Sequence, residues 1–582
     1  MSPVASRTAS WRDWLDPVLT GALALGLALR VASLAHGLPY VYNPDETSIL
    51  SRALALASGD PNPHNFLYPS LYFYVIAACV GGLALVSTAV GAVGSLAQFE
   101  ARFWQDPTAV YLVGRSISVL AGVLTVAAVY RLATRVGDRT SARVAAILMA
   151  VAYIPVRDAH FLKHDVPATL LIVMAVLASW RVWQRGSARD YMLAGASVGV
   201  AFAFHYPAAL AAAALLAAHA LRARAGSGGW FGGRAWAAVL AGAAAFAVCS
   251  PYVLLDHATA WRDIQANRAI IVGRAQQAFG LFGSALPQLE LLRTQGAGMA
   301  WLAAAAAGAW ALARASGASL VWLASFPVAF ALFISNTWPF GRTANPLYPF
   351  LAVLGGLGVA WIGRRAGRWA PWAVAGLTVL TAAEPLALSW RFDALMGQTD
   401  TRTLAMQWIE SRVPAGAGVA VEPYSVQVPA TRAQLLAALE AAGIKPEHAG
   451  RRSRTMLARN PYPAPAYRLY YIGERGMDED KIYLAPASFA RRAGWTGPSG
   501  VCLDAIVLKR AAPRGDNPLS RLVARYARKT HEESPFVDPA DEAGIGFLAD
   551  FDVRPSSAVT RPGPVLEIWQ TAASCAAGRP GP

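Results

Sequence analysis

The sequence predicts a polytopic α-helical membrane protein that carries a soluble α/β domain at its C-terminal end. Of its 582 residues, 55% are hydrophobic and only 15% are charged, far from the balance of a soluble globular chain. A hydrocarbon core of roughly 30 Å needs about 20 apolar residues per helix, and such stretches recur from Asp16 to Leu388. After Trp390 they stop. We therefore expect a transmembrane domain over 1–389 and a soluble domain over 390–582.

About eleven stretches have the length and composition of a membrane span. They are 17–37, 110–130, 141–156, 166–183, 190–205, 207–222, 236–255, 296–313, 317–335, 345–362 and 370–389. The first of them is too long for the apolar region of a signal peptide, and no small-residue cleavage site follows it. We therefore expect the first stretch to remain as a span.

Arginines in the short loops between these stretches predict the orientation of the protein. They are Arg131, Arg135, Arg139 and Arg143; Arg181, Arg185 and Arg189; Arg222, Arg224 and Arg234; and Arg364, Arg365 and Arg368. Because short cytoplasmic loops carry an excess of Arg and Lys, we expect these loops on the cytoplasmic side. The segments 157–165, 256–294 and 336–344 then lie on the opposite side.

A further apolar stretch at 68–93 is also long enough to span. Arg7 and Arg12 favour a cytoplasmic N-terminus, which places the loop after the first span outside. Both ends of 68–93 are then outside, so we expect it to be an interfacial or re-entrant helix. Eleven crossings put the C-terminal domain outside the cytoplasm. A twelve-span arrangement, in which the first helix or the whole remainder is reversed, is the alternative.

The formal net charge of +16 first suggests nucleic-acid binding. The positions of the arginines argue against it, since the positive-inside rule already accounts for many of them. We expect a multi-pass plasma-membrane protein whose partners are membrane lipids and which binds no nucleic acid.

The four cysteines are Cys79, Cys249, Cys502 and Cys575, and their spacing is typical of neither a zinc site nor a redox motif. Cys502 and Cys575 both fall in the soluble domain. If that domain lies outside the cytoplasm, a disulfide between them is allowed; two buried thiols are the alternative.

Two outer loops hold candidate catalytic residues. Asp45 and Glu46 directly follow the first span. In isolation Asp45 is explained as the cap of a helix that starts there, but adjacent carboxylates at a membrane surface are often functional when they face a cavity. The second loop, 157–165, ends in Asp165, whose carboxylate suits the start of the next helix.

The same loop also carries the residue types that a charged substrate needs. Arg157, His160, Lys163 and His164 lie within it. A lysine, an arginine and two histidines this close together can hold a phosphate, although a solvated turn also explains them.

Further candidate binding residues follow later in the chain. His205 and Tyr206 join two predicted helices, and Arg342 and Tyr348 lead into a late span. Each is also compatible with a tight interhelical turn. The long outer segment 256–294 has amphipathic spacing, which predicts helices that lie on the membrane surface.

These pieces, in this order, resemble the polytopic GT-C glycosyltransferases of family 39, the group that includes protein O-mannosyltransferases and the aminoarabinose transferases of lipid A. The matching pieces are Asp45-Glu46, the tract from Arg115-Ser116 to Tyr130, His160 to Asp165, Arg342, Leu347-Tyr348-Pro349-Phe350, Asp400-Thr401-Arg402, Ala405-Met406-Gln407-Trp408-Ile409, and then Pro414 and Gly416. The ordered set covers most of the chain.

The resemblance implies transfer of a hexosyl or pentosyl group from a polyprenyl-phosphate donor to a lipid, glycan or protein acceptor on the outer face, with inversion. It implies that Asp45 is the base and that Glu46 assists or orients it. Asp165 is the second acidic residue of the family pattern. Lys163, His160 and Arg342 are the candidates for holding the phosphate that leaves, because that group needs charge stabilisation more than a proton.

We expect no cofactor and no metal, although Asp45 and Asp165 could share a divalent cation through oxygen ligands. The sequence departs from the family pattern at Thr47, where an aromatic residue often follows the acidic pair, and at His205, where lysine is frequent. The resemblance therefore does not indicate which acceptor this protein uses.

After residue 400 we expect a compact α/β domain. Its predicted elements are helices at 401–412 and 431–442 and strands near 419–421, 482–484, 503–508 and 565–569. Proline- and glycine-rich stretches at 495–499 and 561–564 are expected to be loops.

A transporter or flippase of lipid-linked sugars is the main alternative function. Transporters usually place ionisable residues near the bilayer midplane, in broken helices. Here the acids cluster at helix ends on one face, which favours chemistry at the membrane surface. A non-catalytic scaffold leaves these acidic loops unexplained.

Overall fold

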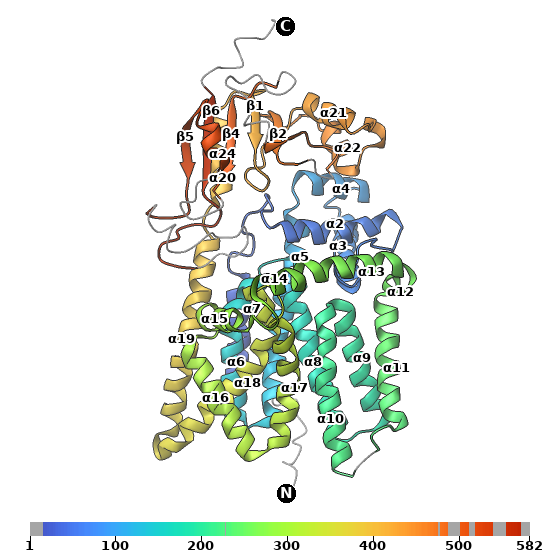
Figure 1. Ribbon diagram of the computed structural model, residues 1–582, viewed down its shortest axis with the longest axis vertical. Helices are drawn as coiled ribbons and strands as arrows, with labels where there is room; N and C mark the ends of the chain where they lie inside the picture. The colour runs from blue at the N-terminus through green and yellow to red at the C-terminus, as the bar shows by residue number, and fades with distance from the viewer. Residues whose placement is uncertain are drawn as a thin grey trace, which may run out of the picture. The chain divides into compact units, whose positions relative to one another are not determined.

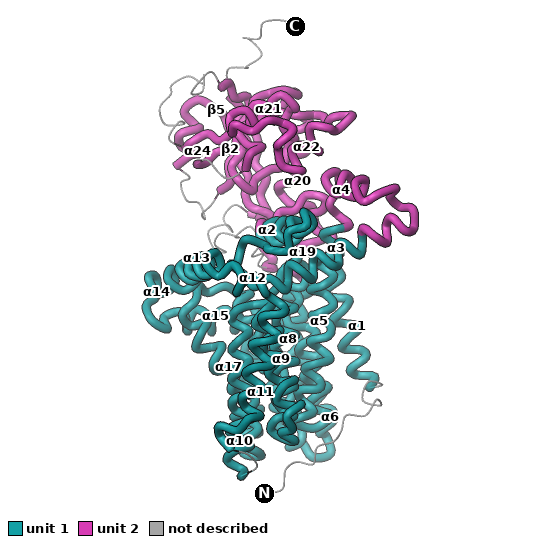
Figure 2. The backbone as a smooth tube through the Cα atoms, turned by 90° about the vertical axis from the view of Figure 1, so that its right-hand side faces the viewer, with its two compact units in different colours: residues 1–34, 45–83, 110–390 teal, residues 35–44, 84–109, 391–582 magenta. Residues whose placement is uncertain are grey.

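The computed structural model describes residues 16–226, 229–474, 478–486, 501–510, 518–538 and 555–571. The chain forms two compact units (Figure 2). The first consists of Met1–Leu34, Asp45–Leu83 and Val110–Trp390, and the second of Ala35–Pro44, Ala84–Ala109 and Arg391–Pro582. The second unit therefore includes two short segments that precede residue 390.

The first unit is built of helices (Figure 1). Those that lie wholly or mainly in it are α1 (Pro17–Val31), α2 (Pro44–Ala55), α3 (Leu71–Ala89), α5 (Thr108–Val136), α6 (Arg139–Val151), α7 (Tyr153–Asp158), α8 (Asp165–Gln184), α9 (Ala188–Phe204), α10 (Ala212–Arg224), α11 (Gly233–Cys249), α12 (Pro251–Leu255), α13 (His257–Arg268), α14 (Arg274–Phe279), α15 (Ala285–Gln295), α16 (Gly298–Ala315), α17 (Gly317–Ile334), α18 (Tyr348–Gly363) and α19 (Ala370–Met396). Shorter helical turns are η2 (Leu56–Ser58), η3 (Tyr206–Ala211), η4 (Ala269–Gly273), η5 (Gly341–Leu347) and η6 (Arg364–Trp369).

Every predicted span overlaps a helix, in order α1, α5, α6, α8, α9, α10, α11, α16, α17, α18 and α19. By length and composition, 6 helices or continuous helical runs within the described ranges can cross a membrane, or 7 if the bent pair of α15 and α16 is one span. One of them is α3, and another is a single run that contains both α18 and α19. The prediction of an apolar helical protein is confirmed. The count of eleven and the interfacial placement of 68–93 stay predictions.

Glycines bring the helices of this unit close together. A Cβ at Gly358 of α18 would overlap the carbonyl oxygen of Ala304 in α16, and one at Gly356 would overlap that of Ser141 in α6. Small residues that let backbones approach are typical of helix packing in membranes, where apolar burial between helices provides little driving force. The central helix α18 is thus fixed by backbone contact on two sides.

The predicted span 141–156 is broken into α6 and α7 at Ala152. Pro155 has no N–H to donate to the carbonyl of Val151, four residues earlier. That carbonyl instead accepts a hydrogen bond from the Ser389 hydroxyl at 3.0 Å. The break redirects the chain into the segment 157–165, which carries half of the candidate binding residues.

The second unit is an α/β domain. Its elements are α4 (Leu96–Gln105), α20 (Thr401–Arg412), β1 (Gly418–Val421), α21 (Arg432–Ala441), η7 (Pro446–His448), α22 (Arg451–Ala458), β2 (Arg468–Ile472), β3 (Tyr483–Leu484), β4 (Ala505–Lys509), α24 (Pro518–Val523), β5 (Ala527–Glu533) and β6 (Leu566–Thr571). Within the described residues, six strands form one sheet in the order β3-β2-β1-β4-β6-β5. The first four strands in this order pair in parallel, and β6 is antiparallel to both β4 and β5.

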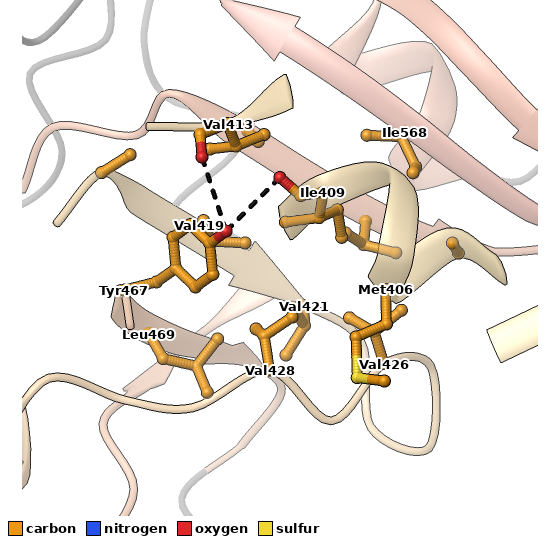
Figure 3. Packing of buried hydrophobic residues seen from close by; sticks show 14 of the residues in the cluster. Met406, Ile409, Val413, Val419, Val421, Val426, Val428, Tyr467, Leu469 and Ile568 are labelled. Carbon is orange, nitrogen blue, oxygen red and sulfur yellow. Dashed lines mark hydrogen bonds between the residues drawn. The ribbon is translucent and has the colours of Figure 1, made fainter. Parts of the chain in front are cut away.

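Alternation along the strands separates two cores. Val419 and Val421 of β1 face a core that includes Ile409 of α20, whereas Ala420 between them faces the other side. In the first core the buried hydroxyl of Tyr467 donates to the carbonyl of Ile409 at 3.3 Å and lies 3.4 Å from that of Val413 (Figure 3). A buried hydroxyl needs such a partner.

The predicted helices and strands of the C-terminal domain begin and end within two residues of the observed ones, while β2 and β5 were not predicted. Cys502 is disulfide-bonded. Cys575, with which the sequence allows a disulfide, lies outside the described residues, as does the predicted loop 495–499.

The close contact at Gly358 can be tested by substitution. We expect Gly358→Ala to lower the thermal unfolding midpoint of the detergent-solubilised protein clearly, because overpacking against backbone costs about 1–3 kcal/mol. Gly376→Ala in α19 is the matched control, since a Cβ there meets nothing within 4 Å. It should be neutral or slightly stabilising. Equal midpoints for the two variants would contradict the packing described above.

Candidate active site

Asp45 lies in the first turn of α2, directly after Pro44, the first residue of that helix. Proline is tolerated at this position because its missing N–H would have no partner there, and a carboxylate in the first turn is favoured by the helix dipole. Asp45 therefore lies inside the helix and is not its N-cap residue.

The carboxylate of Asp45 contacts two cations through one oxygen. Its Oδ2 lies 2.8 Å from Nζ of Lys163 and 2.6 Å from Nη1 of Arg342. The side chain of Lys163 is 6% exposed, while those of Asp45 and Arg342 are 36% and 27% exposed. The cluster is therefore open to solvent on the side of Asp45 and Arg342.

These charges set the protonation of Asp45. Burial raises the pKa of the carboxyl, but the charges of Lys163 and Arg342 lower it by more, and the pKa ends well below its usual range. Asp45 is thus ionised at neutral pH. While both cations hold it, it is a weak base.

The segment that carries Lys163 is anchored on α5. The side chain of Leu162 fills the space that a Cβ would occupy at Gly114. The hydroxyl of Ser118 donates to the carbonyl of Phe161 at 2.8 Å and lies 3.2 Å from that of Lys163. These contacts fix the backbone from which the Lys163 side chain reaches Asp45.

Glu46 makes a bidentate ion pair with Arg115 of α5. Its two carboxylate oxygens accept from Nε and Nη2 of Arg115, each at 2.9 Å, and Oε1 also accepts from the N–H of Leu162 at 2.8 Å. Arg115 donates in addition to the carbonyl of Leu34 at 2.7 Å. The two side chains are 0% and 1% exposed. Glu46 therefore joins α2, α5 and the 157–165 segment from the inside and is closed off from solvent.

Two histidines lie beside the cluster. The ring centroids of His164 and His205 are 4.6 Å apart, and the ring of Tyr68 lies 4.1 Å from that of His164. Burial lowers the pKa of His164; Asp165 opposes this and Arg342 adds to it, so the pKa stays below its ordinary value. His164 is then neutral near pH 7 and contributes no positive charge to a phosphate site.

Asp165 is the first residue of α8 and interacts electrostatically with Lys163 and Arg342. It makes no direct ion pair within the part of the chain that the structure describes. No group of three or more His, Cys, Asp or Glu side chains among the described residues could hold a metal ion.

Arg157 and Tyr348 lie inside the protein. Arg157 donates to Asp158 at 2.8 Å, and the other oxygen of Asp158 accepts from the side-chain amide of Asn345. The side chains of Arg157 and Asp158 are 3% and 5% exposed, and Tyr348 is 0% exposed. The contacts of Arg157, Asp158 and Asn345 join α7 to η5. The predicted substrate-binding role of Arg157 and Tyr348 stays a prediction.

His160 and Tyr206 also bond to the backbone. The two ring nitrogens of His160 lie 2.9 Å from the carbonyl of Val156 and 2.7 Å from that of Ala32, and the side chain is buried. The Tyr206 hydroxyl donates to the carbonyl of Phe66 at 3.1 Å. The described contacts of the His160 ring are thus with backbone carbonyls of α7 and of the end of α1, and its predicted role in holding a phosphate stays a prediction.

Sequence reasoning missed two residues near Asp45. Arg52 interacts electrostatically with it and lies seven residues, about two turns, further along α2. Helical spacing alone could have indicated Arg52. Tyr68, by contrast, comes from an irregular segment, and no local pattern connects it with His164.

The family model described as "Dolichyl-phosphate-mannose-protein mannosyltransferase" matches residues 108–254. These residues include the anchor on α5 and the segment with Lys163. No curated protein sequence matches the chain.

Several solved structures are similar at low sequence identity. ArnT from Cupriavidus metallidurans bound to undecaprenyl phosphate is 14% identical with a TM-score of 0.49, and the match covers 96% of this chain and 98% of that one. The Archaeoglobus fulgidus oligosaccharyltransferase in the apo form is 14% identical with a TM-score of 0.45. That match covers 71% of this chain and 63% of the archaeal one.

The same archaeal protein, AglB, in complex with an inhibitory peptide and a dolichol-phosphate, is also 14% identical, with a TM-score of 0.45 and coverage of 74% and 68%. The family match over 108–254 confirms the predicted resemblance of this chain to the mannosyltransferase group of GT-C glycosyltransferases.

Proposed function

We propose that this protein is a membrane glycosyltransferase that moves a sugar from a polyprenyl-phosphate donor to an acceptor hydroxyl. The observation that carries the proposal is the contact of Asp45 with both Lys163 and Arg342 in a partly exposed cluster. This transfer needs a base for the acceptor and positive charge for the departing phosphate. The cluster holds both. The family match over 108–254 supports the same class of reaction.

In the proposed reaction, the acceptor oxygen attacks C1 of the sugar on the face opposite the phosphate, so the anomeric configuration inverts. The bond from C1 to the phosphate oxygen breaks, and its electron pair leaves with the phosphate. The hydroxyl proton passes to the carboxylate of Asp45. Lys163 and Arg342 balance the charge that develops on the phosphate, so one base is sufficient.

We infer that this chemistry takes place on the outer side of an eleven-span plasma-membrane protein. Asp45, Lys163 and Arg342 come from three separate segments that meet in one cluster, and the arginine distribution predicts the same side for all three. The disulfide at Cys502 supports an extracytoplasmic C-terminal domain, since disulfides persist in oxidising compartments.

We assign Glu46 as a positioning residue rather than an acid or base. It is fully buried, and its oxygens are engaged by Arg115 and by the N–H of Leu162. Because Leu162 precedes Lys163, the carboxylate of Glu46 helps to place the Lys163 side chain. Asp165 acts through its charge on Arg342.

The role of Asp45 can be tested by Asp45→Asn. We expect transfer of a radiolabelled sugar from a polyprenyl-phosphate donor to fall by about 10²–10⁴-fold, because the amide cannot take the acceptor proton. Lipids, glycans and peptides of the cell envelope are offered as acceptors in proteoliposomes.

Asp60→Asn is the matched control for this substitution. Asp60 is 53% exposed and pairs with the exposed His64, so its loss should leave transfer unchanged. Full transfer by Asp45→Asn would rule out Asp45 as the base. Movement of intact donor across the bilayer without transfer would favour the flippase.

The buried pair gives a separate prediction. Glu46→Gln leaves Arg115 without its counter-charge, and breaking a buried pair in this way costs about 3–5 kcal/mol. We expect a large fall in the thermal unfolding midpoint in detergent. The double variant Glu46→Gln/Arg115→Gln should recover much of it, because no buried charge is left alone.

Activity separates a positioning role for Glu46 from a purely structural one. If Glu46 places Lys163, the recovered double variant still has a raised KM for the donor. Wild-type donor KM in that variant would restrict Glu46 to stability.

A further inference from the structure

We propose that the donor phosphate displaces Asp45 from Lys163 and Arg342, so that donor binding itself releases the base. This inference rests on the proposed function and adds an order of events to it. In the structure, the two cations that would hold the phosphate are both in contact with the base. The carboxylate therefore occupies the anion site that the substrate needs.

The geometry shows why the two anions compete. Lys163 and Arg342 both contact Oδ2 of Asp45, at 2.8 and 2.6 Å, so their charged groups converge on one point. A phosphate oxygen placed between them would take the position of that carboxylate oxygen. Two anionic oxygens cannot share this position, because like charges in contact repel strongly.

Burial indicates which of the three side chains moves. The Lys163 side chain is 6% exposed and its ammonium lies 5.7 Å from the Phe161 ring centroid, on a backbone anchored to α5. A buried ammonium without a partner is costly. Lys163 therefore stays in place and exchanges one anion for another. Asp45, which is 36% exposed, is the side chain that can turn toward water.

Arg342 is also held on a second side. Its guanidinium carbon lies 5.1 Å from the Phe340 ring centroid. The Arg342 side chain also interacts electrostatically with Asp165, in addition to its ion pair with Asp45. When Asp45 leaves, Asp165 still balances part of the charge on Arg342. The site can therefore accept a phosphate without first assembling its cations.

Release changes the chemistry of Asp45. Lys163 and Arg342 are the nearby charges that most stabilise its ionised form, and Arg52, Tyr68 and His164 are further titratable groups that act on it. Once its two cations bind phosphate, the carboxylate becomes a stronger base. It then takes the proton of the acceptor hydroxyl while C1 transfers from phosphate to that oxygen. Deprotonation of the acceptor is thereby limited to the donor-loaded enzyme.

Binding of undecaprenyl phosphate to the full-length protein in nanodiscs tests this exchange without any need for turnover. We expect Asp45→Asn to bind this lipid about tenfold more tightly than wild type, because no carboxylate has to be displaced, whereas Lys163→Gln should bind it at least tenfold more weakly. Titration calorimetry measures both, and thermal unfolding confirms that each variant is folded.

Two further variants control for charge alone. Asp60→Asn should leave the affinity unchanged, since Asp60 is exposed and pairs with His64. Asp165→Asn removes a nearby negative charge that contacts neither cation directly, so its gain should be smaller than that of Asp45→Asn. An equal gain in both would assign the effect to net charge and overturn the exchange.

Unchanged or weaker binding of undecaprenyl phosphate to Asp45→Asn would also overturn it. Inorganic phosphate forms a separate arm of the experiment. If Asp45→Asn binds only undecaprenyl phosphate more tightly than wild type, the result supports exchange with a lipid phosphate. If it binds both ligands more tightly, the result supports exchange with phosphate in general. If the binding prediction holds while wild type transfers no sugar, the exchange stands and the proposed function fails.

Discussion

The buried ion pair of Glu46 and Arg115 is the interaction on which the candidate site depends. It joins three parts of the chain that are distant in sequence: α2, α5 and the segment 157–165. An apolar contact could hold these parts together, but it would not fix their rotation and register as a bidentate pair does. Since Asp45 and Lys163 are the immediate neighbours of residues in this network, their contact is a consequence of it.

Two adjacent acids therefore have opposite surroundings. Successive residues on a helix point about 100° apart, so Glu46 can face α5 while Asp45 faces the solvent-accessible cluster. Glu46 is fully buried and Asp45 is 36% exposed. Two adjacent acidic residues at the start of a helix can therefore have different roles. Here we assign one residue to geometry and the other to chemistry.

Much of the fold was predictable because its signals are local. Apolar stretches of span length predicted every long helix, and short apolar runs bounded by turn residues predicted strands such as β1 and β4. The break at Ala152 was not predicted, although Pro155 was a visible signal for it. β5 was missed because its charged sequence lacks the apolar alternation of a half-buried strand.

The site was predictable only in part. The arginine rule brought Asp45, Lys163 and Arg342 to one side of the membrane, and the structure brings them into contact. The sequence does not indicate which charges are buried, because their partners are distant along the chain. Arg115 is 69 residues from Glu46, and Asn345, which donates to Asp158, is 187 residues from it. Arg157 and Lys163 look alike in one loop, and only tertiary packing pairs the first with the buried Asp158 and the second with the partly exposed Asp45.

The formal charges of the cluster fit the proposed reaction. Lys163 and Arg342 balance the carboxylates of Asp45 and Asp165, so these four side chains together carry no net formal charge. A donor phosphodiester adds one negative charge. As C1 transfers, the phosphate gains a second negative charge and Asp45 loses its own by taking the proton, so the total stays constant. His164 fits this balance because it is neutral and adds no charge. The reaction then only moves charge within reach of two fixed cations, which is the condition under which preorganised groups stabilise a transition state most effectively.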